Sequence, residues 1–329
     1  MFFSKAVGID LGTANILIYV KGVGVVLDEP SVVALEADTR KTLAVGQEAK
    51  EMLGRTPGRV VAIRPLKDGV IADFEVTEIM ISYFIKKLNL KGMFNRPNIL
   101  ICCPSNITTV ERKAIIDSAY RAGAKKVFVE EEPKVAALGA GLDFSKASGA
   151  MILDVGGGTT DVAILSLGEI VTSTSLKIAG DRLDKDIIKY MKDTYKLLIG
   201  DRMAEEIKIK IGNAWRGHSN DTFMVSGRDL VTGLPHTVTI TADETEAAMH
   251  ESLQDIVRAC RTVLEQTPPE LAADIVTKGV VITGGGGLLN GLDELLLNEL
   301  NIPVAIAENA LTCVAEGTGI MLEYLHLTK

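Results

Sequence analysis

Apolar runs of strand length recur along the chain and alternate with stretches whose apolar residues have helical spacing. The first three runs, Ala6–Ile9, Ile16–Val20 and Val25–Asp28, follow one another closely and are broken by Gly12 and by a turn at residues 22–24. Short β-rich runs separated by glycine turns predict that the chain opens as a meander. Later runs of the same kind are Asn98–Cys102, Lys126–Val129, Ala150–Asp154, Val162–Ser166 and Gly279–Ile282.

Helices are predicted between these runs. Thr108 precedes Glu111 by three residues and Asp243 precedes Glu246 by the same interval, which predicts a capping box at the start of two helices. Because strands alternate with helices, the predicted fold class is α/β. Two apolar faces have helical spacing: Val76, Ile79, Met80, Tyr83, Phe84 and Leu88 form one, and Leu253, Ile256, Val257, Cys260 and Leu264 form the other.

Length and composition fit a globular protein of two lobes. The chain has 329 residues, which suits two lobes of about 150 residues each. Its residues are 47% hydrophobic and 24% charged, so a large core is available. No apolar run reaches the roughly 18 residues of a membrane-spanning helix. The start, Met1–Lys5, lacks the long apolar region and the cleavage site of a secretory signal.

Charge and metal-ligating residue types argue against two classes of function. The net charge is -8 and the pI is near 5.2, which disfavours a nucleic-acid partner because phosphates need a basic surface. The histidines are scattered, and none has the spacing of zinc ligands. The cysteines, two of them neighbours in an apolar run, are predicted to be buried small hydrophobes in a reducing cytosol.

A short motif occurs twice, once in each predicted lobe. Gly8–Asn15 and Asp154–Asp161 each combine an Asp, a glycine-containing turn and a Thr, and each is followed by a strand. Two such hairpins suggest an internal duplication whose halves face each other across a cleft. A third glycine-rich segment, Ile282–Leu289, is predicted to follow a strand and open a helix.

These turns have the chemistry of a nucleotide site. Glycine lets backbone N–H groups approach a phosphate closely, and Thr hydroxyls add donors. Asp10 and Asp154 supply carboxylates where Mg²⁺ carried by the phosphates needs oxygen ligands or hydrogen-bonded waters. One turn of this kind is most often only a turn, so the ordered set of three carries the hypothesis. The chain has neither a Walker sequence nor Gly-x-Gly-x-x-Gly.

That ordered set resembles the superfamily of actin, the sugar kinases and the heat-shock ATPases. The first phosphate loop would be Asp10–Asn15, the second Asp154–Asp161 and the adenosine loop Gly284–Gly287, with the family's connecting helix at Val129–Gly139. Three segments are similar to the MreB family in particular: Gly8–Asn15, Glu131–Pro133 before an Ala-rich helix, and Thr267–Leu271. Three others lean toward its Mbl branch: Arg64–Phe74, Leu100–Pro104 and Glu130–Lys134.

The resemblance implies an actin-like fold, with two lobes around a nucleotide cleft. The first lobe is expected at residues 1–145 and 315–329, with a small subdomain at about 33–65. The second lobe is expected at 146–314, with a small subdomain at about 182–245.

The resemblance also implies roles for individual residues. Asp10 and Asp154 would hold Mg²⁺ through its waters, and Glu132 would position or activate the attacking water, with help from Thr159 and Asp161. The residues expected to bind ATP are Gly12, Thr13, Ala14, Asn15, Gly156, Gly157, Gly158, Thr159, Gly180, Glu205, Lys208, Gly284, Gly285, Gly286 and Gly287.

Two of these assignments have structural alternatives. Glu130–Glu132 would also suit an acidic helix start, where negative charge is favourable, with Glu130 or Glu131 as the cap. Glu205 and Lys208, three residues apart on one helix face, would look the same as an exposed ion pair.

The function implied by the resemblance is an ATP-dependent, membrane-associated filament that organises cell-wall synthesis and maintains rod shape, with slow ATP hydrolysis coupled to assembly. Its partners would be other copies of itself and membrane proteins of the MreC, MreD and RodZ type. It would lie in the cytoplasm, bound to the inner face of the membrane through Phe2, Phe3, Met93 and Phe94. Met93 and Phe94 would alternatively pack back onto the first lobe. The competing function is a soluble small-molecule kinase or ATPase of the same fold.

Overall fold

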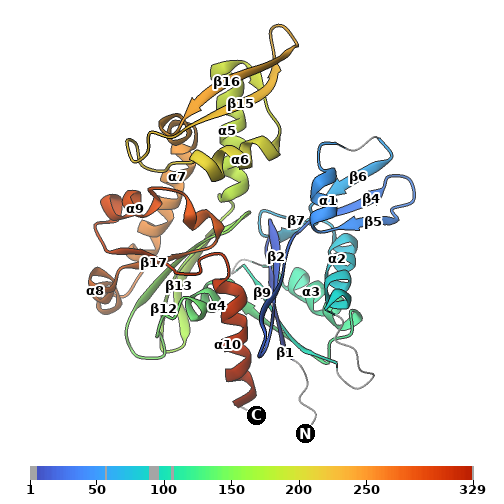
Figure 1. Ribbon diagram of the computed structural model, residues 1–329. Helices are drawn as coiled ribbons and strands as arrows, with labels where there is room; N and C mark the ends of the chain where they lie inside the picture. Colours follow the sequence, from blue (N-terminus) through green and yellow to red (C-terminus); the bar gives the residue numbers. More distant parts are fainter. Residues whose placement is uncertain (1–5, 56–57, 89–95, 105–106, 328–329) are drawn as a thin grey trace. The chain divides into compact units, whose positions relative to one another are not determined.

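The computed structural model describes residues 6–55, 58–88, 96–104 and 107–327. The chain forms two compact units (Figure 1). Unit 1 comprises Met1–Asp143 and Leu311–Lys329, and unit 2 comprises Phe144–Ala310. Each unit is built around its own five-stranded sheet.

The sheet of unit 1 begins with the predicted meander. Strands β1 (Ala6–Leu11), β2 (Asn15–Val20) and β3 (Gly24–Pro30) pair antiparallel in sequence order. Strands β9 (Asn98–Cys103) and β10 (Lys126–Glu131) then extend the sheet parallel to β1, giving the order β10-β9-β1-β2-β3. β1 and β9 are buried along their whole length, which fits their apolar sequences.

Two helices of unit 1 cover this sheet where the sequence predicts them. Helix α2 (Phe74–Lys87) buries the face that contains Met80 and Phe84 and packs against α3 (Thr109–Arg121). The capping box of α3 is confirmed, because Thr108 Oγ1 accepts the Glu111 N–H while the Glu111 side chain accepts the Thr108 N–H.

The connecting helix begins later than expected. Helix α4 spans Glu132–Gly139, whereas Val129 and its neighbours up to Glu131 continue strand β10. Pro133 explains this start, because proline has no N–H and is favoured in the first turn of a helix. Glu131 occupies the N-cap position, but its side chain makes no capping hydrogen bond. It can stabilise the helix only through the attraction between its negative charge and the positive end of the helix dipole.

Glycines allow helix α10 (Cys313–Leu327) to pack closely on α4 and β1. A Cβ atom on Gly317 would lie 2.0 Å from the Val135 carbonyl oxygen, and one on Gly139 would lie 1.8 Å from the Cys313 carbonyl oxygen. A Cβ on Gly8 of β1 would lie 1.6 Å from Thr318 Oγ1. Helix α10 therefore packs on the rest of unit 1 at distances that only glycine permits.

A smaller sheet with its own core lies within unit 1. Strands β4 (Val33–Glu36), β5 (Thr42–Val45) and β6 (Val60–Ile63) pair in the order β5-β4-β6, and helix α1 (Gln47–Met52) packs on them. Its core is made of small residues such as Ala34, Ala44 and Ala49. A separate pair, β7 (Leu66–Lys67) and β8 (Val70–Ile71), completes the unit.

The sheet of unit 2 repeats the pattern of unit 1. Strands β11 (Ala150–Val155), β12 (Thr160–Ser166) and β13 (Glu169–Leu176) form an antiparallel meander. Strands β17 (Val280–Thr283) and β18 (Val304–Ile306) then add parallel on the other side of β11. The order β13-β12-β11-β17-β18 matches β3-β2-β1-β9-β10, which supports the internal duplication.

Helices α7 (Ala242–Glu265), α8 (Pro269–Lys278) and α9 (Leu292–Leu300) lie in the same unit as this sheet, and α7 buries the apolar face predicted from Leu253 onward. The expected capping box at Asp243 and Glu246 is wrong. Thr241 and Glu244 form the box instead, because Thr241 pairs with Thr222 at the end of a strand and the helix must begin after it.

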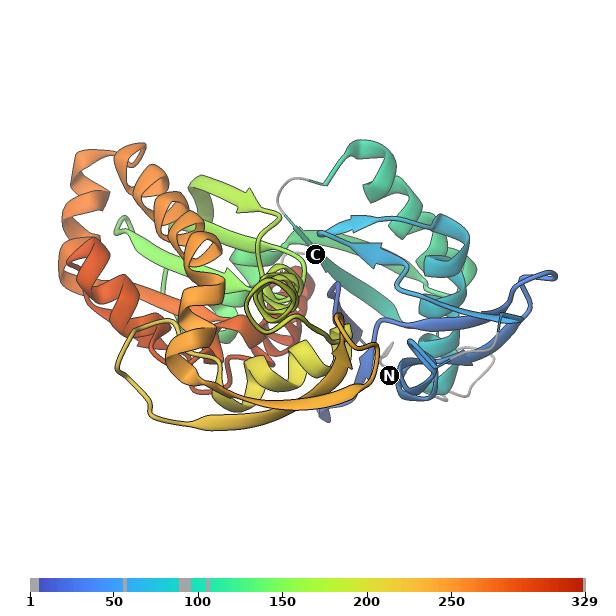
Figure 2. The same ribbon diagram turned by 90° about the horizontal axis from the view of Figure 1, so that it is seen from above.

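The remaining part of unit 2 lies between β13 and α7. It contains α5 (Gly180–Tyr195), α6 (Asp201–Ile211) and the sheet β14 (Leu197–Leu198), β15 (Thr222–Asp229) and β16 (Pro235–Thr241). In Figure 2 helix α5 is viewed nearly along its axis, with the yellow α6 beside it. Among the described residues, no helix is both long enough and apolar enough to cross a membrane.

Candidate nucleotide-binding site

The carboxyl edge of the unit 1 sheet gathers acidic side chains. Asp10 of β1 aligns with Cys102 of β9, and Cys102 aligns with Glu130 of β10. Glu132 begins helix α4 directly after β10. Burial raises the pKa of the Cys102 thiol well above its usual range, and the negative charges of Asp10 and Glu132 add to this shift. Asp10 and Glu132, expected in the same site, therefore lie near the same strand end.

The turn after β1 is braced from outside. Ser31 donates its N–H to the Ala14 carbonyl (2.9 Å) and its hydroxyl to the Gly12 carbonyl (2.7 Å). The Gly69 N–H donates to Thr13 Oγ1 at 3.2 Å. Ser31 is fully buried, so these bonds are shielded from water. Together they hold the backbone of the turn in one conformation.

Gly12 and Asn15 close this turn. A Cβ atom on Gly12 would lie 2.5 Å from the Asn15 carbonyl oxygen, so only glycine fits. The Asn15 side-chain amide donates to Asp28 Oδ1 at 2.7 Å, which joins the start of β2 to β3. Asn15 thus has a structural partner in addition to its expected contact with phosphate.

The matching strand end in unit 2 is a buried polar row. Asp154 of β11 lies directly opposite Asp161 of β12 and aligns on its other side with Thr283 of β17. Asp154 is 3% exposed and Asp161 is 1% exposed. The Thr283 hydroxyl donates to Asp154 Oδ1 at 2.7 Å, yet burial dominates and raises the pKa of Asp154 to about 6.

The turn after β11 is attached to the start of helix α5. Gly156 donates its N–H to the Thr159 carbonyl at 2.9 Å, which closes the turn. The Gly180 N–H then donates to the Gly156 carbonyl (3.1 Å), and the Asp181 N–H donates to the Gly157 carbonyl (2.7 Å). The positive end of the α5 dipole therefore lies against the turn, a favourable place for an anion.

Lys208 of α6 reaches the same place. Its Nζ donates to the Gly180 carbonyl at 2.9 Å and lies 2.8 Å from Asp184 Oδ1. A Cβ atom on Gly180 would lie 3.2 Å from this Nζ, so glycine leaves room for the lysine. Burial raises the pKa of Asp184 to about 6, the Lys208 charge opposes the shift, and the Glu205 charge adds to it. The lysine is largely buried, so an exposed ion pair does not describe it.

The third glycine segment packs on the end of β11. Gly284 has φ of +80°, and a Cβ atom on it would lie 2.3 Å from the Val155 carbonyl oxygen and 2.9 Å from Asp154 Oδ1. A Cβ on Gly286 would lie 2.4 Å from Val155 Cγ1. The segment follows β17, as the sequence predicts, but it forms a short 3₁₀ turn, Gly285–Leu288, and helix α9 begins only at Leu292.

The structure thus assembles two groups of the expected residues. Unit 2 brings together Asp154, Asp161, the turn at residues 156–159, Gly180, Lys208 and the glycines from Gly284. Unit 1 brings together Asp10, the turn at residues 12–15 and Glu132. The proposed membrane residues Phe2, Phe3, Met93 and Phe94 lie outside the described residues.

Three supporting residues have roles that the sequence does not predict: Ser31, Asp184 and Thr283, the last of which lies inside the third glycine-rich segment. Ser31 braces a turn that is 19 positions away, and Thr283 bonds a residue 129 positions away, so no local pattern indicates either. Asp184 lies one helical turn after Gly180 in α5. This spacing is the one feature of the sequence that places Asp184 on the same helix face as Gly180.

The donor set of unit 2 fits Mg²⁺. It consists of oxygen atoms, which this cation prefers to nitrogen or sulfur. Asp154 is a buried carboxylate whose charged form burial disfavours, and a nearby divalent cation would stabilise that form.

The comparison with known families identifies the chain. The family model described as MreB/Mbl protein matches residues 4–329. The chain belongs to the MreB/Mbl family. The cell shape-determining protein Mbl of Bacillus subtilis (strain 168) is 59% identical, with 98% of this chain and 96% of Mbl covered. The cell shape-determining protein MreB of Escherichia coli (strain K12) is 52% identical, with 99% and 95% covered.

A solved structure of the MreB/Mbl family confirms the actin-like fold. The crystal structure of MreB 5 of Spiroplasma citri bound to AMPPNP has a TM-score of 0.95 and 38% identity, and the match covers 100% of this chain and 98% of that one. A second structure, of the same protein bound to ADP, has a TM-score of 0.94. The predicted membership of the MreB family and the leaning toward Mbl are both confirmed.

Proposed function

We propose that this member of the MreB/Mbl family binds ATP with Mg²⁺, polymerises into filaments on the inner face of the cytoplasmic membrane, and organises the wall synthesis that maintains rod shape. The relatives named cell shape-determining protein cover nearly the whole chain at 52% and 59% identity. The observation that supports nucleotide binding most directly is a braced glycine turn beside a buried aspartate in each unit.

The proposed ligands of ATP and Mg²⁺ include residues of each unit. Asp10 and Asp154 would hold Mg²⁺ through its waters, and the ion would supply positive charge to offset the phosphates. The turns at residues 12–15 and 156–159 would bind the phosphates, and Lys208 with the glycines from Gly284 would hold the nucleoside. Support comes from the AMPPNP and ADP complexes of the Spiroplasma citri protein.

Hydrolysis would be slow and would act as a switch. Glu132 would position or activate the attacking water, with Thr159 and Asp161 orienting it. A carboxylate at the first position of α4 is consistent with this role, since the residue begins a helix that is firmly packed against α10. ATP and ADP would favour different states of the subunit, and the filament interface would respond to that difference.

Membrane attachment would depend on a few inserted apolar side chains. A net charge of -8 is repelled by anionic lipids, so Phe2, Phe3, Met93 and Phe94 would supply most of the affinity. Each subunit would bind weakly, and a filament would add many weak contacts. Membrane proteins of the MreC, MreD and RodZ type would then connect the filament to the wall enzymes.

Sedimentation separates this function from its alternative, a soluble small-molecule kinase or ATPase. The purified chain is centrifuged with Mg²⁺ and ATP, with and without liposomes of anionic and zwitterionic lipid. A filament protein pellets with ATP and co-sediments with liposomes. A chain that stays in the supernatant under every condition, while still hydrolysing ATP, would support the kinase and contradict the filament.

A further inference from the structure

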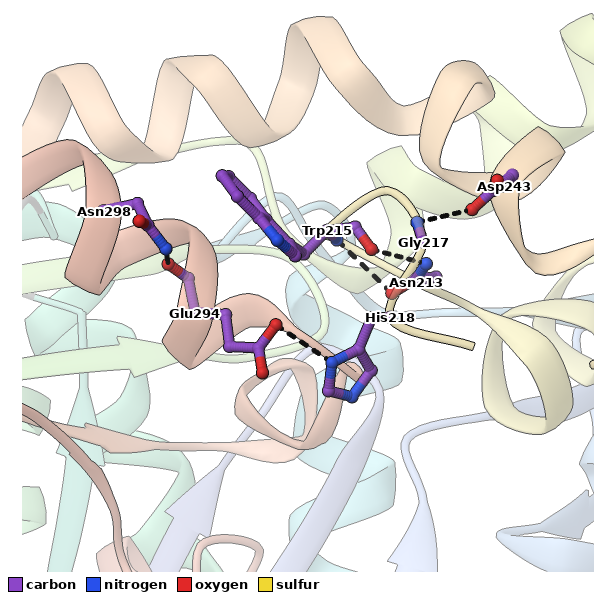
Figure 3. A network of polar contacts seen from close by, with 7 residues as sticks. All are labelled: Asn213, Trp215, Gly217, His218, Asp243, Glu294 and Asn298. Atoms are coloured by element: carbon purple, nitrogen blue, oxygen red, sulfur yellow. Dashed lines mark hydrogen bonds and ion pairs between the residues drawn. The ribbon is translucent and has the colours of Figure 1, made fainter. Parts of the chain in front are cut away.

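The segment that follows helix α6, Gly212–His218, forms an ordered link to two other helices. It contains the only tryptophan of the chain. Figure 3 shows this segment, which we call the strap, lying between the start of α7, where Asp243 is found, and helix α9, where Glu294 is found. None of the nucleotide contacts proposed above uses it.

Asn213 is the centre of the strap. Its side chain is 0% exposed. Its Nδ2 donates to the Trp215 carbonyl (2.8 Å), and its Oδ1 accepts the Trp215 N–H (3.3 Å). Its own N–H donates to Thr245 Oγ1 at 3.1 Å, and that hydroxyl also bonds the carbonyl of Ile211, the last residue of α6. The main chain of Asn213 and the Thr245 hydroxyl therefore join the end of α6 to α7, and the Asn213 side chain holds the strap in one conformation through Trp215.

The strap also packs on the residues that follow the third glycine segment. Asn213 forms a parallel bridge with Asn290, and the Ala214 N–H donates to the Asn290 carbonyl at 2.7 Å. Gly291 has φ of +73°, and a Cβ atom on it would lie 2.9 Å from Trp215 Cβ and 3.2 Å from Asn213 Oδ1. This contact comes directly after the turn Gly285–Leu288.

The outer end of the strap is held by exposed contacts of a different kind. The Gly217 N–H donates to Asp243 Oδ1 at 2.8 Å, and His218 Nδ1 lies 3.0 Å from Glu294 Oε2 (Figure 3). Asn298 Nδ2 donates to the Glu294 carbonyl at 2.7 Å. Exposed pairs of this type contribute little to rigidity, so the buried bonds of Asn213 are the ones that fix the strap.

We propose that Asn213 is a positioning residue for the nucleoside half of the bound nucleotide. Lys208 lies one turn before the strap on α6, and the glycines from Gly284 lie just before its contact at Asn290. By fixing these two elements against each other, Asn213 sets the spacing into which the ribose and base fit. This role rests on the proposed function and adds a residue that would act through Lys208 and the glycines from Gly284.

The test compares nucleotide affinities of folded variants. Asn213→Ala removes both bonds to Trp215, so the strap loosens and dissociation constants for ATP and ADP should rise by the same factor, about tenfold. An equal factor is expected because both ligands share the nucleoside. Asn213→Ser retains an acceptor for the Trp215 N–H and should restore part of the affinity. Fluorescent-nucleotide titration measures both constants.

Two matched variants separate positioning from loss of stability. Asp274→Ala removes the bonds of α8 to Ser148 and Gly149 before the start of β11, so it should lower the thermal midpoint without changing either dissociation constant. His218→Gln removes only the exposed pair with Glu294 and should change neither property.

Several results would contradict the role of Asn213. Unchanged affinities in folded Asn213→Ala, or an equal loss in Asp274→Ala, would overturn it. A change in the ratio of ATP to ADP affinity would also overturn it, because the effect would then lie at the phosphates. Should Asn213→Ala fail to fold, Asn213→Ser still loses the bond from Nδ2 to the Trp215 carbonyl, and wild-type affinity in that variant would overturn the role equally. A wild-type chain that binds neither nucleotide would refute the proposed function instead.

Discussion

Replacing Asp154 by Asn should stabilise the nucleotide-free protein while it removes a ligand-binding group. Asp154 is buried opposite Asp161, and its one described partner, the Thr283 hydroxyl, does not offset its loss of water. Burial raises its pKa from 3.8 to about 6. At 1.36 kcal/mol per pH unit, this difference corresponds to about 3 kcal/mol.

The sign of the effect follows from the direction of the pKa change. The folded-state pKa of Asp154 lies above the unfolded value. Its contribution to stability is therefore greatest below pH 3.8, where Asp154 is protonated in both states. That contribution is lost as the pH rises through about 6, because the buried carboxyl group then ionises. Asparagine is neutral at every pH and can still accept the Thr283 hydroxyl. At pH 7.5 the variant should therefore gain up to about 3 kcal/mol, or about 6–12 °C in thermal midpoint at 2–4 °C per kcal/mol.

Thermal unfolding between pH 4.5 and 7.5, without nucleotide, measures this gain. The difference between Asp154→Asn and wild type should shrink as the pH falls, since wild-type Asp154 becomes protonated. Adding Mg²⁺ and ATP should raise the midpoint of wild type but not that of the variant. Asp274→Asn is the control with the opposite sign. Hydrogen bonds from Gly149 and Ser148 lower the pKa of Asp274, so removing its negative charge should destabilise the protein at pH 7.5.

A variant that melts at or below the wild-type temperature at pH 7.5 would refute the burial argument. A gain that is the same at every pH would also refute it, because ionisation of Asp154 would then not be its cause. A variant that is stabilised by Mg²⁺ and ATP as strongly as wild type would place the cation elsewhere.

Three further outcomes are expected. Glu132→Ala should keep its affinity for ATP but lose phosphate release in a colorimetric assay; unchanged hydrolysis would remove Glu132 from its proposed role. Replacing Met93 and Phe94 by Ser should release filaments from liposomes in sedimentation without preventing assembly. Filaments that still bind liposomes would show that other residues attach the protein to the membrane. Gly317→Ala puts a Cβ atom 2.0 Å from the Val135 carbonyl oxygen and should lower the free energy of unfolding by about 1–3 kcal/mol. An unchanged thermal midpoint would show that α4 and α10 can move apart without loss of stability.

Local features of the site were predictable from the sequence. The turns at 12–15 and 156–159 were identified because a strand, an aspartate and a glycine turn are contiguous in sequence. The repeated motif predicts an internal duplication, and the matching strand order of the two sheets supports it. The glycine turn after β17 is predictable because four consecutive glycines directly follow an apolar run of strand length.

Element boundaries were less predictable because neighbouring patterns compete. In the segment from Thr241 to Glu246, two overlapping pairs fit a capping box, and only the pairing of Thr241 with Thr222 in the sheet selects the first. Val129 could extend a strand or begin a helix, and its alignment with Ile101 in β9 keeps it in the strand.

The supporting contacts could not be predicted because they join distant parts of the chain. Ser31 donates a hydrogen bond to Gly12, and Asn213 forms a bridge with Asn290. The sequence around Ser31 or Asn213 contains no pattern that predicts either partner. Such contacts depend on how strands and helices pack, which single-sequence patterns do not specify.

The buried cysteines have a practical consequence for imaging. Cys102, Cys103, Cys260 and Cys313 are each 3% exposed or less. Burial raises the pKa of Cys103 and of Cys260 to about 12, so these thiols stay protonated and unreactive at neutral pH. A single cysteine introduced on the surface could therefore be labelled with a maleimide dye in the otherwise native chain, and growing polymers could be followed by fluorescence microscopy.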